Sequence, residues 1–552
     1  MQYFVLFVIF TFLVFIIYLR NKANPKKQRK AIPGERLLQY LPALVFILIL
    51  IVGIVVRTHR FGVIPDGVNI DEAAMGYDAY SLLTYGIDMN GYKNPVVLIG
   101  FGSGHQSLYA YLSMPFIAIM GLNQTSIKMT NLVFGILSLV IFYLLVRRTD
   151  DKKMAMFALF LLAINPWHVM ISRWGLDCNL FPAIFLIATY LFTFYEEKPM
   201  LYVLSMAIYG LAFYAYETSY FLVPVFMVLL TIYLLIQKKI PLKILVIGLL
   251  AFCLVSLPIM IYLIINTFDL DPIITSWISI PKTLGPARML TVSTIFSGGD
   301  FIHQSLNNVV SLIRFLIFQE DSSLMIHNFV PGYGTTYLFS LPFQFIGLWG
   351  LVTEIAKKRT MSKNFIILIW LSASLLLGLA LKININRMNI IFIPLIYLIA
   401  KAIDYIHEQL NTPAILGMSL FVIGFIFFTD AYFHSWPQDV SPAYNTSLDK
   451  AINFATDNTN GTIYLSKTIH KSFMYVLFNR KIDPNEFLDS VVYENPNTSK
   501  RDVISFGQYR FVEINSMPLG GGAYIISNLE KDQFGLDGLN STEFEKFSVF
   551  LP

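Results

Sequence analysis

Long apolar runs separated by short polar segments dominate the sequence. A helix needs about 20 mostly apolar residues to cross the hydrocarbon core of a bilayer, and about twelve runs approach that length. They cover roughly residues 4–18, 38–56, 127–146, 154–171, 180–195, 201–216, 220–236, 242–265, 337–355, 365–381, 388–403 and 413–428. The pattern therefore predicts an all-α polytopic membrane protein with about twelve transmembrane helices.

One further apolar run, residues 108–122, contains Pro115 and has only modest length. Such a run is predicted to lie in the membrane interface rather than to cross the bilayer. Residues 57–126 then form a first long loop, and residues 266–336 form a second. Both exceed ordinary connection lengths, which is typical of functional loops.

Lysine and arginine are concentrated in alternate loops, at residues 20–30, 147–153, 238–243 and 357–363. Cytoplasmic loops carry an excess of these residues, so all four loops are predicted to be cytoplasmic. Both long loops and the C-terminus then lie on the extracytoplasmic face. The expected location is the plasma membrane, where membrane lipids surround the chain.

The composition changes near residue 430, after which polar residues dominate. Residues 447–456 have helical spacing, and short β-rich runs follow at residues 462–466, 474–478, 509–514 and 523–527. We therefore expect two domains. Residues 1–430 form the transmembrane domain, and residues 431–552 form a small extracytoplasmic α/β domain.

Composition agrees with the membrane assignment. The 552 residues are 56% hydrophobic and 14% charged, whereas soluble domains carry about a quarter charged residues. This excludes a set of soluble domains and a disordered chain. Only Cys178 and Cys253 are present, which excludes a disulfide scaffold. The net charge of +5 lies in short clusters, so nucleic-acid binding is not expected.

The first long loop contains an adjacent pair of carboxylates, Asp71 and Glu72. Carboxylates beside a membrane must be solvated, paired or functional. A partly desolvated carboxylate can act as a general base. The alternative is that one of the two residues only caps the helix that follows.

Between two predicted spans, residues 166–179 place His168, Arg173 and Asp177 close together in the sequence. A functional role competes with an interfacial aromatic belt, formed by two tryptophans of this segment, in which Arg173 reaches lipid headgroups.

A second polar break, at residues 382–387, ends in Asn386 and Arg387. Arg387 either extends to the interface or binds a phosphate, for which a guanidinium is well shaped. Carboxylates and guanidinium groups thus collect at helix ends on one face. That arrangement suits the transfer of a group from a phosphate-bearing lipid to a hydroxyl or amine acceptor.

Four segments carry a resemblance to a known family: residues 71–112, residues 165–175, residues 327–334 and the pair Asn386-Arg387. In this order and spacing they resemble the bacterial branch of the dolichyl-phosphate-mannose protein mannosyltransferase-like family, which includes aminoarabinose lipid A transferases. The similarity extends to about residue 428.

This resemblance implies the glycosyltransferase C (GT-C) membrane fold and a polyprenyl-phosphate-linked sugar donor. The enzyme would be a hexosyl- or pentosyltransferase whose extracytoplasmic acceptor is a glycan, a lipid or a protein. Asp71 would be the general base, Asp177 a second acidic residue and Arg387 a contact of the donor phosphate.

Further substrate contacts are expected from the residues that lie inside these segments, namely Tyr109, His168, Arg173 and Asn386. Many bacterial relatives carry Lys-Pro-Pro where this chain has His105-Gln106-Ser107, so His105 is expected to take the place of that lysine.

A single displacement from a lipid-phosphate leaving group needs a base for the nucleophile and positive charge for the phosphate, and it inverts the anomeric centre. No nucleotide is needed. No dense ligand pattern demands a metal, although a divalent cation near Asp71, Glu72 and Asp177 stays open. The alternative function is a lipid or solute transporter or flippase, but the spans are nearly free of charge and show no repeat.

Overall fold

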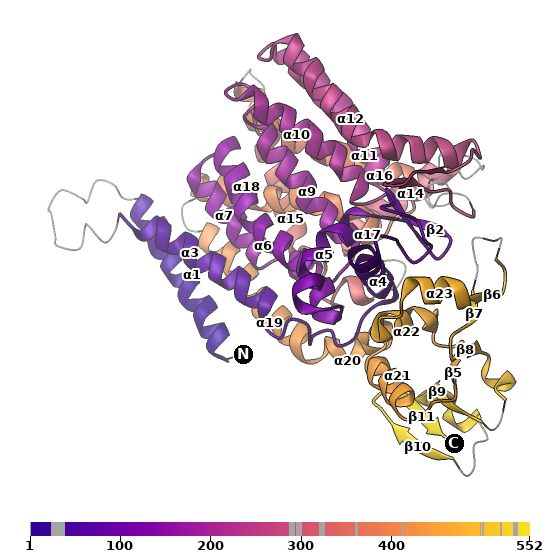
Figure 1. Cartoon of the computed structure of the whole chain (residues 1–552). Coiled ribbons are helices and arrows are strands. Elements are labelled where there is room, and N and C mark those ends of the chain that lie inside the picture. The colour runs from indigo at the N-terminus through magenta and orange to yellow at the C-terminus, as the bar shows by residue number, and fades with distance from the viewer. Residues whose placement is uncertain are drawn as a thin grey trace.

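The computed structural model describes residues 2–23, 39–285, 293, 301–319, 326–358, 363–410, 413–496, 498, 502–518, 521–533 and 539–552. It consists of a large assembly of helices with a β-rich C-terminal domain at one end (Figure 1). The basic residues predicted at positions 24–30 lie outside the described part of the chain.

Within the described ranges, eight helical stretches are long and apolar enough to cross a membrane. These stretches coincide largely with α1 (Gln2–Ala23), α3 (Leu41–Thr58), α6 (Gln124–Thr149), α11 (Ser219–Gln237), α12 (Leu242–Thr267), α15 (Leu341–Lys358), α18 (Phe392–Leu410) and α19 (Pro413–His434). Three predicted spans are shorter apolar helices: α9 (Asp177–Phe192), α10 (Pro199–Leu211) and α16 (Phe365–Ala380). The number of crossings therefore stays a prediction.

The predicted span over residues 154–171 is divided into α7 (Lys152–Ala163) and α8 (Pro166–Ile171). Pro166 has no N–H to continue α7, whereas it fits the first turn of a new helix. The Asn165 side chain accepts a hydrogen bond from the N–H of His168 at 3.0 Å and caps α8. The prediction of one continuous helix was wrong at this point.

The distribution of buried and exposed apolar side chains is the one expected for a protein surrounded by lipid. Of the residues in the stretch that includes α18, 83% are buried, whereas only 22% of those in the α12 stretch are buried. On α12, large apolar residues such as Leu250 and Leu254 are exposed. An exposed apolar surface of this extent indicates membrane contact.

The first long loop is ordered. It contains α4 (Ile70–Tyr85), a hairpin of β1 (Val97–Gly100) and β2 (Ser103–Gln106), and α5 (Leu108–Met120). The predicted interfacial run is thus a helix, although its place in the interface stays a prediction.

The second long loop contains β3 (Ile273–Ile274), β4 (Ser279–Ile280) and an unexpected helix, α14 (Phe301–Phe318). One side of α14 exposes Ile302, Leu306, Val310, Ile313 and Ile317 at helical spacing. An exposed apolar stripe of this kind is typical of a helix that lies on a bilayer.

The C-terminal domain contains a mixed seven-stranded sheet with the order β10-β11-β9-β5-β8-β7-β6. Its strands are β5 (Thr462–Ser466), β6 (Val492–Tyr493), β7 (Val503–Phe506), β8 (Tyr509–Val512), β9 (Gly522–Ser527), β10 (Asn540–Glu543) and β11 (Phe547–Leu551). β5 is parallel to both of its neighbours, β8 and β9. Helices α21 (Leu448–Asp457), α22 (Ser472–Arg480) and α23 (Pro484–Ser490) complete the domain.

The predicted helix at residues 447–456 and three of the four predicted strands are present in this domain. The strand predicted at residues 474–478 is instead part of α22. Residues 472–478 are all buried, and a continuous apolar run does not distinguish a buried strand from a buried helix.

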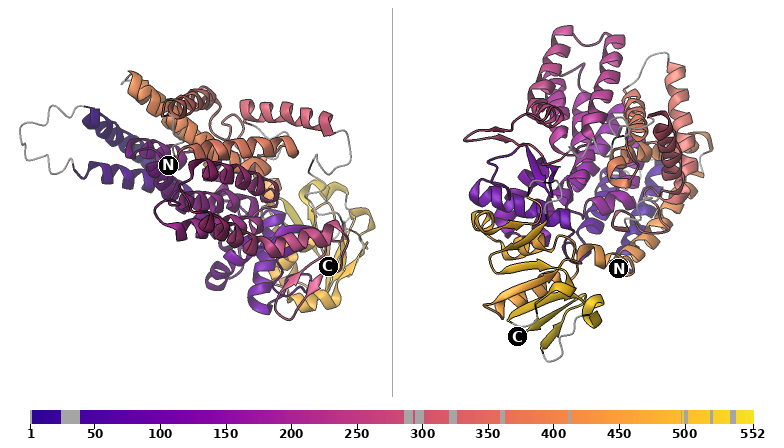
Figure 2. Two further views of the ribbon diagram at one scale, coloured as in Figure 1. Left: turned by 90° about the horizontal axis from the view of Figure 1, so that it is seen from above. Right: turned by 90° about the vertical axis from the view of Figure 1, so that its right-hand side faces the viewer.

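Helix α22 packs against α4, so the C-terminal domain contacts the first long loop (Figures 1 and 2). Gly76 of α4 lies against the ring of Phe478, and the Tyr77 hydroxyl donates to the carbonyl of Ile482 at 2.9 Å. Just before α4, Gly67 has a φ of +88°, and a Cβ at this position would overlap the carbonyl oxygen of Tyr444. The two backbones therefore approach too closely for a side chain.

We expect Gly67→Ala to destabilise the protein more than Gly86→Ala. Gly86 also has a positive φ, +73°, but no atom lies within 4 Å of a Cβ there. Gly86→Ala should therefore cost only the left-handed strain, about 1 kcal/mol, whereas Gly67→Ala adds a backbone clash and should cost roughly 3 kcal/mol. Thermal unfolding of the purified variants measures the difference. Equal unfolding midpoints would contradict the close approach.

Candidate active site

The site begins at the first turn of α4, which carries both predicted carboxylates. The side-chain oxygen of Asn69 accepts the N–H of Asp71 at 3.0 Å, and Glu72 Oε2 accepts the N–H of Asn69 at 2.8 Å. This reciprocal pair is a capping box, which fixes the start of the helix.

Glu72 also joins two segments that are distant in the sequence. Its Oε1 accepts the N–H of Gly175 at 2.7 Å, so both oxygens are occupied, and the side chain is buried. Burial raises the pKa of Glu72, while the positive charge of Lys128 and the two backbone N–H groups oppose that rise. The geometry favours the capping alternative for Glu72 over a direct catalytic role.

Asp71, the neighbouring residue, is in a different environment. Its side chain is 38% exposed, and within the described residues its carboxylate accepts no hydrogen bond. His105 Nε2, from strand β2, lies 4.0 Å from Asp71 Oδ1. The structure thus brings these two predicted site residues together and leaves the Asp71 carboxylate available.

Asp177 and Tyr109 lie close to Gly175. A Cβ built on Gly175 would come within 3.1 Å of both Glu72 Oε1 and the Tyr109 hydroxyl. Asp177 is the first residue of α9, and its Oδ1 accepts the N–H of Cys178 at 2.7 Å. Burial, together with the negative charges of Glu72 and Asp177, raises the pKa of Tyr109. Tyr109 and Asp177, both predicted as site residues, therefore lie beside Gly175, whose N–H is bound by Glu72.

Arg173 is not placed beside Asp71. Its Nη atoms donate to the carbonyls of residues 56, 57, 59, 60 and 64, and its Nε donates to the hydroxyl of Tyr432 at 3.2 Å. The residue is buried and caps the C-terminal end of α3. This geometry gives Arg173 a structural role, and its contact with substrate stays a prediction.

His168 is likewise used inside the helical bundle. It is buried, and its Nδ1 lies 2.6 Å from Nη2 of Arg57, which also donates to the carbonyls of Gly53, Leu162 and Ala163. His168 therefore links α8 to α3, and its contact with substrate stays a prediction.

Arg387 and Asn386 lie on the short helix α17 (Ile385–Met388), and both are half-buried. Asn384 caps this helix by accepting the N–H of Arg387 at 2.8 Å. Arg387 Nη1 donates to the carbonyl of Lys382 at 3.0 Å, but its buried Nε has no hydrogen-bond partner in the described ranges. Arg387 thus retains donor capacity for an anion.

Glu217 is a candidate that the sequence analysis missed. Glu217 is buried and lies two residues before the start of α11. One turn later in the chain, the hydroxyl of Tyr220 donates to Oε1 of Gln106 at 2.9 Å. Gln106 follows His105 in the sequence. The signal was available, because Glu217 is the only charged residue between Lys198 and Lys238. An isolated ionisable group between apolar spans is a functional candidate by default.

Comparisons with known proteins identify the fold and a family that the chain resembles. Residues 105–267 match the family model of dolichyl-phosphate-mannose-protein mannosyltransferase. ArnT from Cupriavidus metallidurans bound to undecaprenyl phosphate has a similar structure, with a TM-score of 0.57 and 11% identity over 92% of this chain and 97% of that chain. Its apo state gives a TM-score of 0.54 and 10% identity over the same shares.

The chain has the GT-C fold and resembles this mannosyltransferase family. AglB from Archaeoglobus fulgidus, in complex with an inhibitory peptide and a dolichol-phosphate, is a more remote match, with a TM-score of 0.48 and 13% identity over 80% of this chain and 64% of that chain. No curated protein matches. The resemblance inferred from the four sequence segments is thus confirmed.

The match to the mannosyltransferase family model covers only part of the candidate active site. It includes His105, Tyr109, Asp177 and Glu217, but Asp71 precedes it and Arg387 follows it. In the described part of the chain, no group of three or more His, Cys, Asp or Glu side chains could hold a metal ion. The roles of Asp71 and Arg387 therefore rest on their own geometry.

We expect Glu72→Gln to lower stability, whereas Asp71→Asn leaves it nearly unchanged. A glutamine presents an NH₂ group to one of the two N–H donors and leaves the buried Lys128 without its counter-charge, at a cost of roughly 2–4 kcal/mol. Asp71 loses no hydrogen bond on amidation. Unfolding midpoints of the two single variants provide the comparison, and an equal loss in both would contradict the different roles of the two carboxylates.

Proposed function

We propose that the protein is an integral membrane glycosyltransferase that moves a sugar from a polyprenyl-phosphate donor to an acceptor on the extracytoplasmic face. The observation that carries the proposal is the GT-C fold shared with ArnT, whose structure was determined with undecaprenyl phosphate bound. The mannosyltransferase family match supports the same class of reaction.

An apolar groove beside the hairpin of the first long loop suits the isoprenoid chain of such a donor. It has a volume of about 510 Å³ and lies between α5, α10, α12 and the β3–β4 turn. Its apolar lining includes Leu108, Tyr111, Leu211, Val255, Pro258 and Trp277. Val96 and Ser107, which flank the hairpin, also line it, so the groove approaches the hairpin that carries His105.

The reaction we propose is a single displacement with Asp71 as the base. Asp71 accepts the proton of the acceptor hydroxyl while that oxygen attacks the anomeric carbon of the donor sugar. The bond from this carbon to the phosphate oxygen breaks, the electron pair leaves with the polyprenyl phosphate, and the anomeric configuration inverts. The exposure of Asp71 and its unused oxygens support this role.

Positive charge must stabilise the departing phosphate. Arg387 is suited to this task because its guanidinium stays charged and keeps a buried Nε–H without a partner in the described residues. His105 would position Asp71 through their 4.0 Å contact. Glu72 would act indirectly, by holding Gly175 against α4. Tyr109, whose hydroxyl donates to the carbonyl of Ile127, and Asp177, which accepts the N–H of Cys178, would support the same region.

Asp71→Asn should reduce sugar transfer by about 10²- to 10⁴-fold while donor binding persists, because the amide keeps the size but not the proton affinity of the carboxylate. Asp71→Glu should recover little, since one added methylene displaces the carboxylate by about 1 Å. The measurement is transfer by purified protein in bilayers, beside binding of the polyprenyl-phosphate sugar.

Asp439→Asn provides the matched control, because Asp439 is an exposed aspartate on α20 (Trp436–Val440) outside the site. Near-normal transfer by Asp71→Asn would exclude Asp71 as the base. Loss of donor binding together with transfer would indicate a binding role instead.

Arg387→Ala should weaken donor binding strongly, and Arg387→Lys should restore it only in part, because lysine offers a point charge instead of a fork of donors. An effect of about tenfold or more is expected for the loss of a charged hydrogen bond to phosphate. Titration with the donor lipid measures it, and Arg314→Ala, on the exposed side of α14, is the control. Equal donor affinity in all variants would leave Arg387 as an interfacial anchor.

A further inference from the structure

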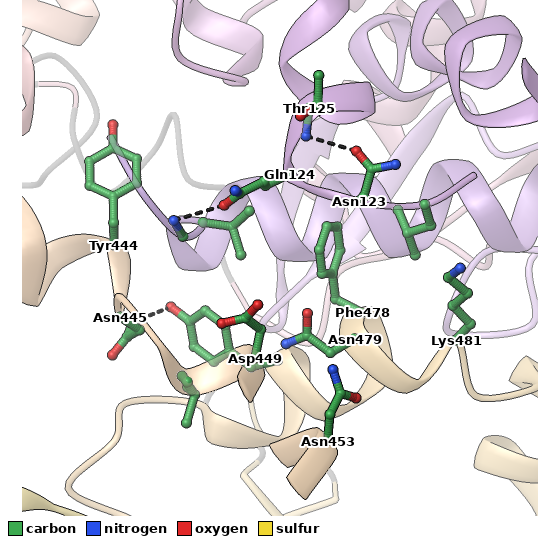
Figure 3. Close-up of a pocket in the computed structure, with 15 residues that line it drawn as sticks. Asn123, Gln124, Thr125, Tyr444, Asn445, Asp449, Asn453, Phe478, Asn479 and Lys481 are labelled. Atoms are coloured by element: carbon green, nitrogen blue, oxygen red, sulfur yellow. Dashed lines mark hydrogen bonds between the residues drawn. The ribbon is translucent and has the colours of Figure 1, made fainter. Parts of the chain in front are cut away.

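A second cavity, of about 410 Å³, lies where the first long loop meets the C-terminal domain (Figure 3). One wall is formed by residues 67–68 and by residues 122–125 at the start of α6. The opposite wall comes from residues 444–453 and from the end of α22. No role in donor binding or in the proposed displacement accounts for this cavity.

Part of its polar lining maintains the local structure. Asn123 caps α6 by accepting the N–H groups of Thr125 and Ser126, and Gln124 Oε1 accepts the N–H of Gly67 at 2.8 Å. Asn445 donates to the hydroxyl of Tyr475 at 2.7 Å. These bonds fix the shape of the walls.

Three other polar side chains keep their hydrogen-bonding capacity. Within the described residues, Asp449, Asn479 and Lys481 make neither a hydrogen bond nor an ion pair. Figure 3 shows Asp449 and Asn479 on the side of the cavity that the C-terminal domain provides, with the ring of Phe478 above Asn479. The cavity therefore offers hydrogen-bond donors and acceptors on two exposed side chains, Asp449 and Lys481, and on the half-buried Asn479.

This combination suits a sugar. A carboxylate and an amide together supply acceptors and donors for neighbouring hydroxyl groups. Asp449 and Lys481 carry opposite charges, which favours a neutral ligand over an anion. A cavity of this size is within the ordinary range for small-molecule sites.

The cavity is also close to the proposed base. Gly67 and Val68 line it and lead directly into the first turn of α4. Tyr475 lines it from α22, and burial together with the charges of Asp71 and Glu72 raises the pKa of this tyrosine. A ligand in the cavity would thus lie along the helix that packs against α4.

We infer that this cavity binds a neutral sugar residue of the acceptor, which makes the acceptor a glycan or glycolipid. The inference rests on the proposed function for the word acceptor, but sugar binding itself requires no donor. The test is therefore a binding measurement on the full-length protein without donor. Saturation-transfer NMR with lactose and with N,N′-diacetylchitobiose should show contact with the sugar ring protons.

The double variant Asp449→Ala/Asn479→Ala should weaken this binding about tenfold or more, because a hydrogen bond to a charged group is lost together with an amide contact. Asn485→Ala/Asp489→Ala, on exposed positions of α23, is the matched control and should bind sugar normally. Should the first pair lower the unfolding midpoint, Asn479→Trp tests the same point by filling the cavity from a half-exposed position.

Loss of the sugar signal in the cavity variants alone supports the inference, even if no transfer is detected, because the donor is absent. Equal signals in both double variants overturn it, even if transfer proceeds normally. Binding of a serine-rich hexapeptide that depends on Asp449 and Asn479, with no sugar signal, also overturns it and assigns the cavity to a peptide.

Discussion

The candidate site depends on the hydrogen bonds that the buried carboxylate of Glu72 accepts. It joins the first turn of α4 to the backbone of Gly175, and it does so where water is excluded. A carboxylate in such a place is costly unless it is paired and hydrogen-bonded. Two backbone N–H groups and the charge of Lys128 meet that requirement. Because the bond needs close approach, a Cβ at position 175 would make tight contacts, at 3.1 Å from Glu72 Oε1 and from the hydroxyl of Tyr109.

The same interaction explains why two adjacent carboxylates are suited to different tasks. Consecutive residues on a helix point in directions about 100° apart, so Glu72 faces the protein while Asp71 faces the open side near His105. Satisfying Glu72 fixes the backbone of α4 without using any oxygen of Asp71. The rigid neighbour therefore provides the orientation, and the exposed neighbour keeps both carboxylate oxygens available.

The sequence predicted the features that depend on local pattern: the apolar helices, the two long loops and the β-rich C-terminal domain. The sequence alone could not predict the features that tertiary contacts determine. Arg173 is a candidate substrate contact in the sequence, and only the folded chain shows that the carbonyls of residues 56, 57, 59, 60 and 64 and the hydroxyl of Tyr432 accept hydrogen bonds from it. The break before Pro166 and the isolated charge of Glu217 were readable from sequence, but they were given too little weight.

The C-terminal domain packs directly on the loop that carries Asp71 and Glu72. Helix α22 contacts α4 through Phe478, and the carbonyl of Ile482, just after α22, accepts the hydroxyl of Tyr77. Helix α22 also carries Tyr475 beside the cavity, so an acceptor bound there would contact the helix that packs against α4, on which Asp71 lies. Binding energy from a part of the acceptor that does not react can thereby orient the reacting hydroxyl. This arrangement gives a physical reason for a β-rich domain to pack on the loop that supplies the base.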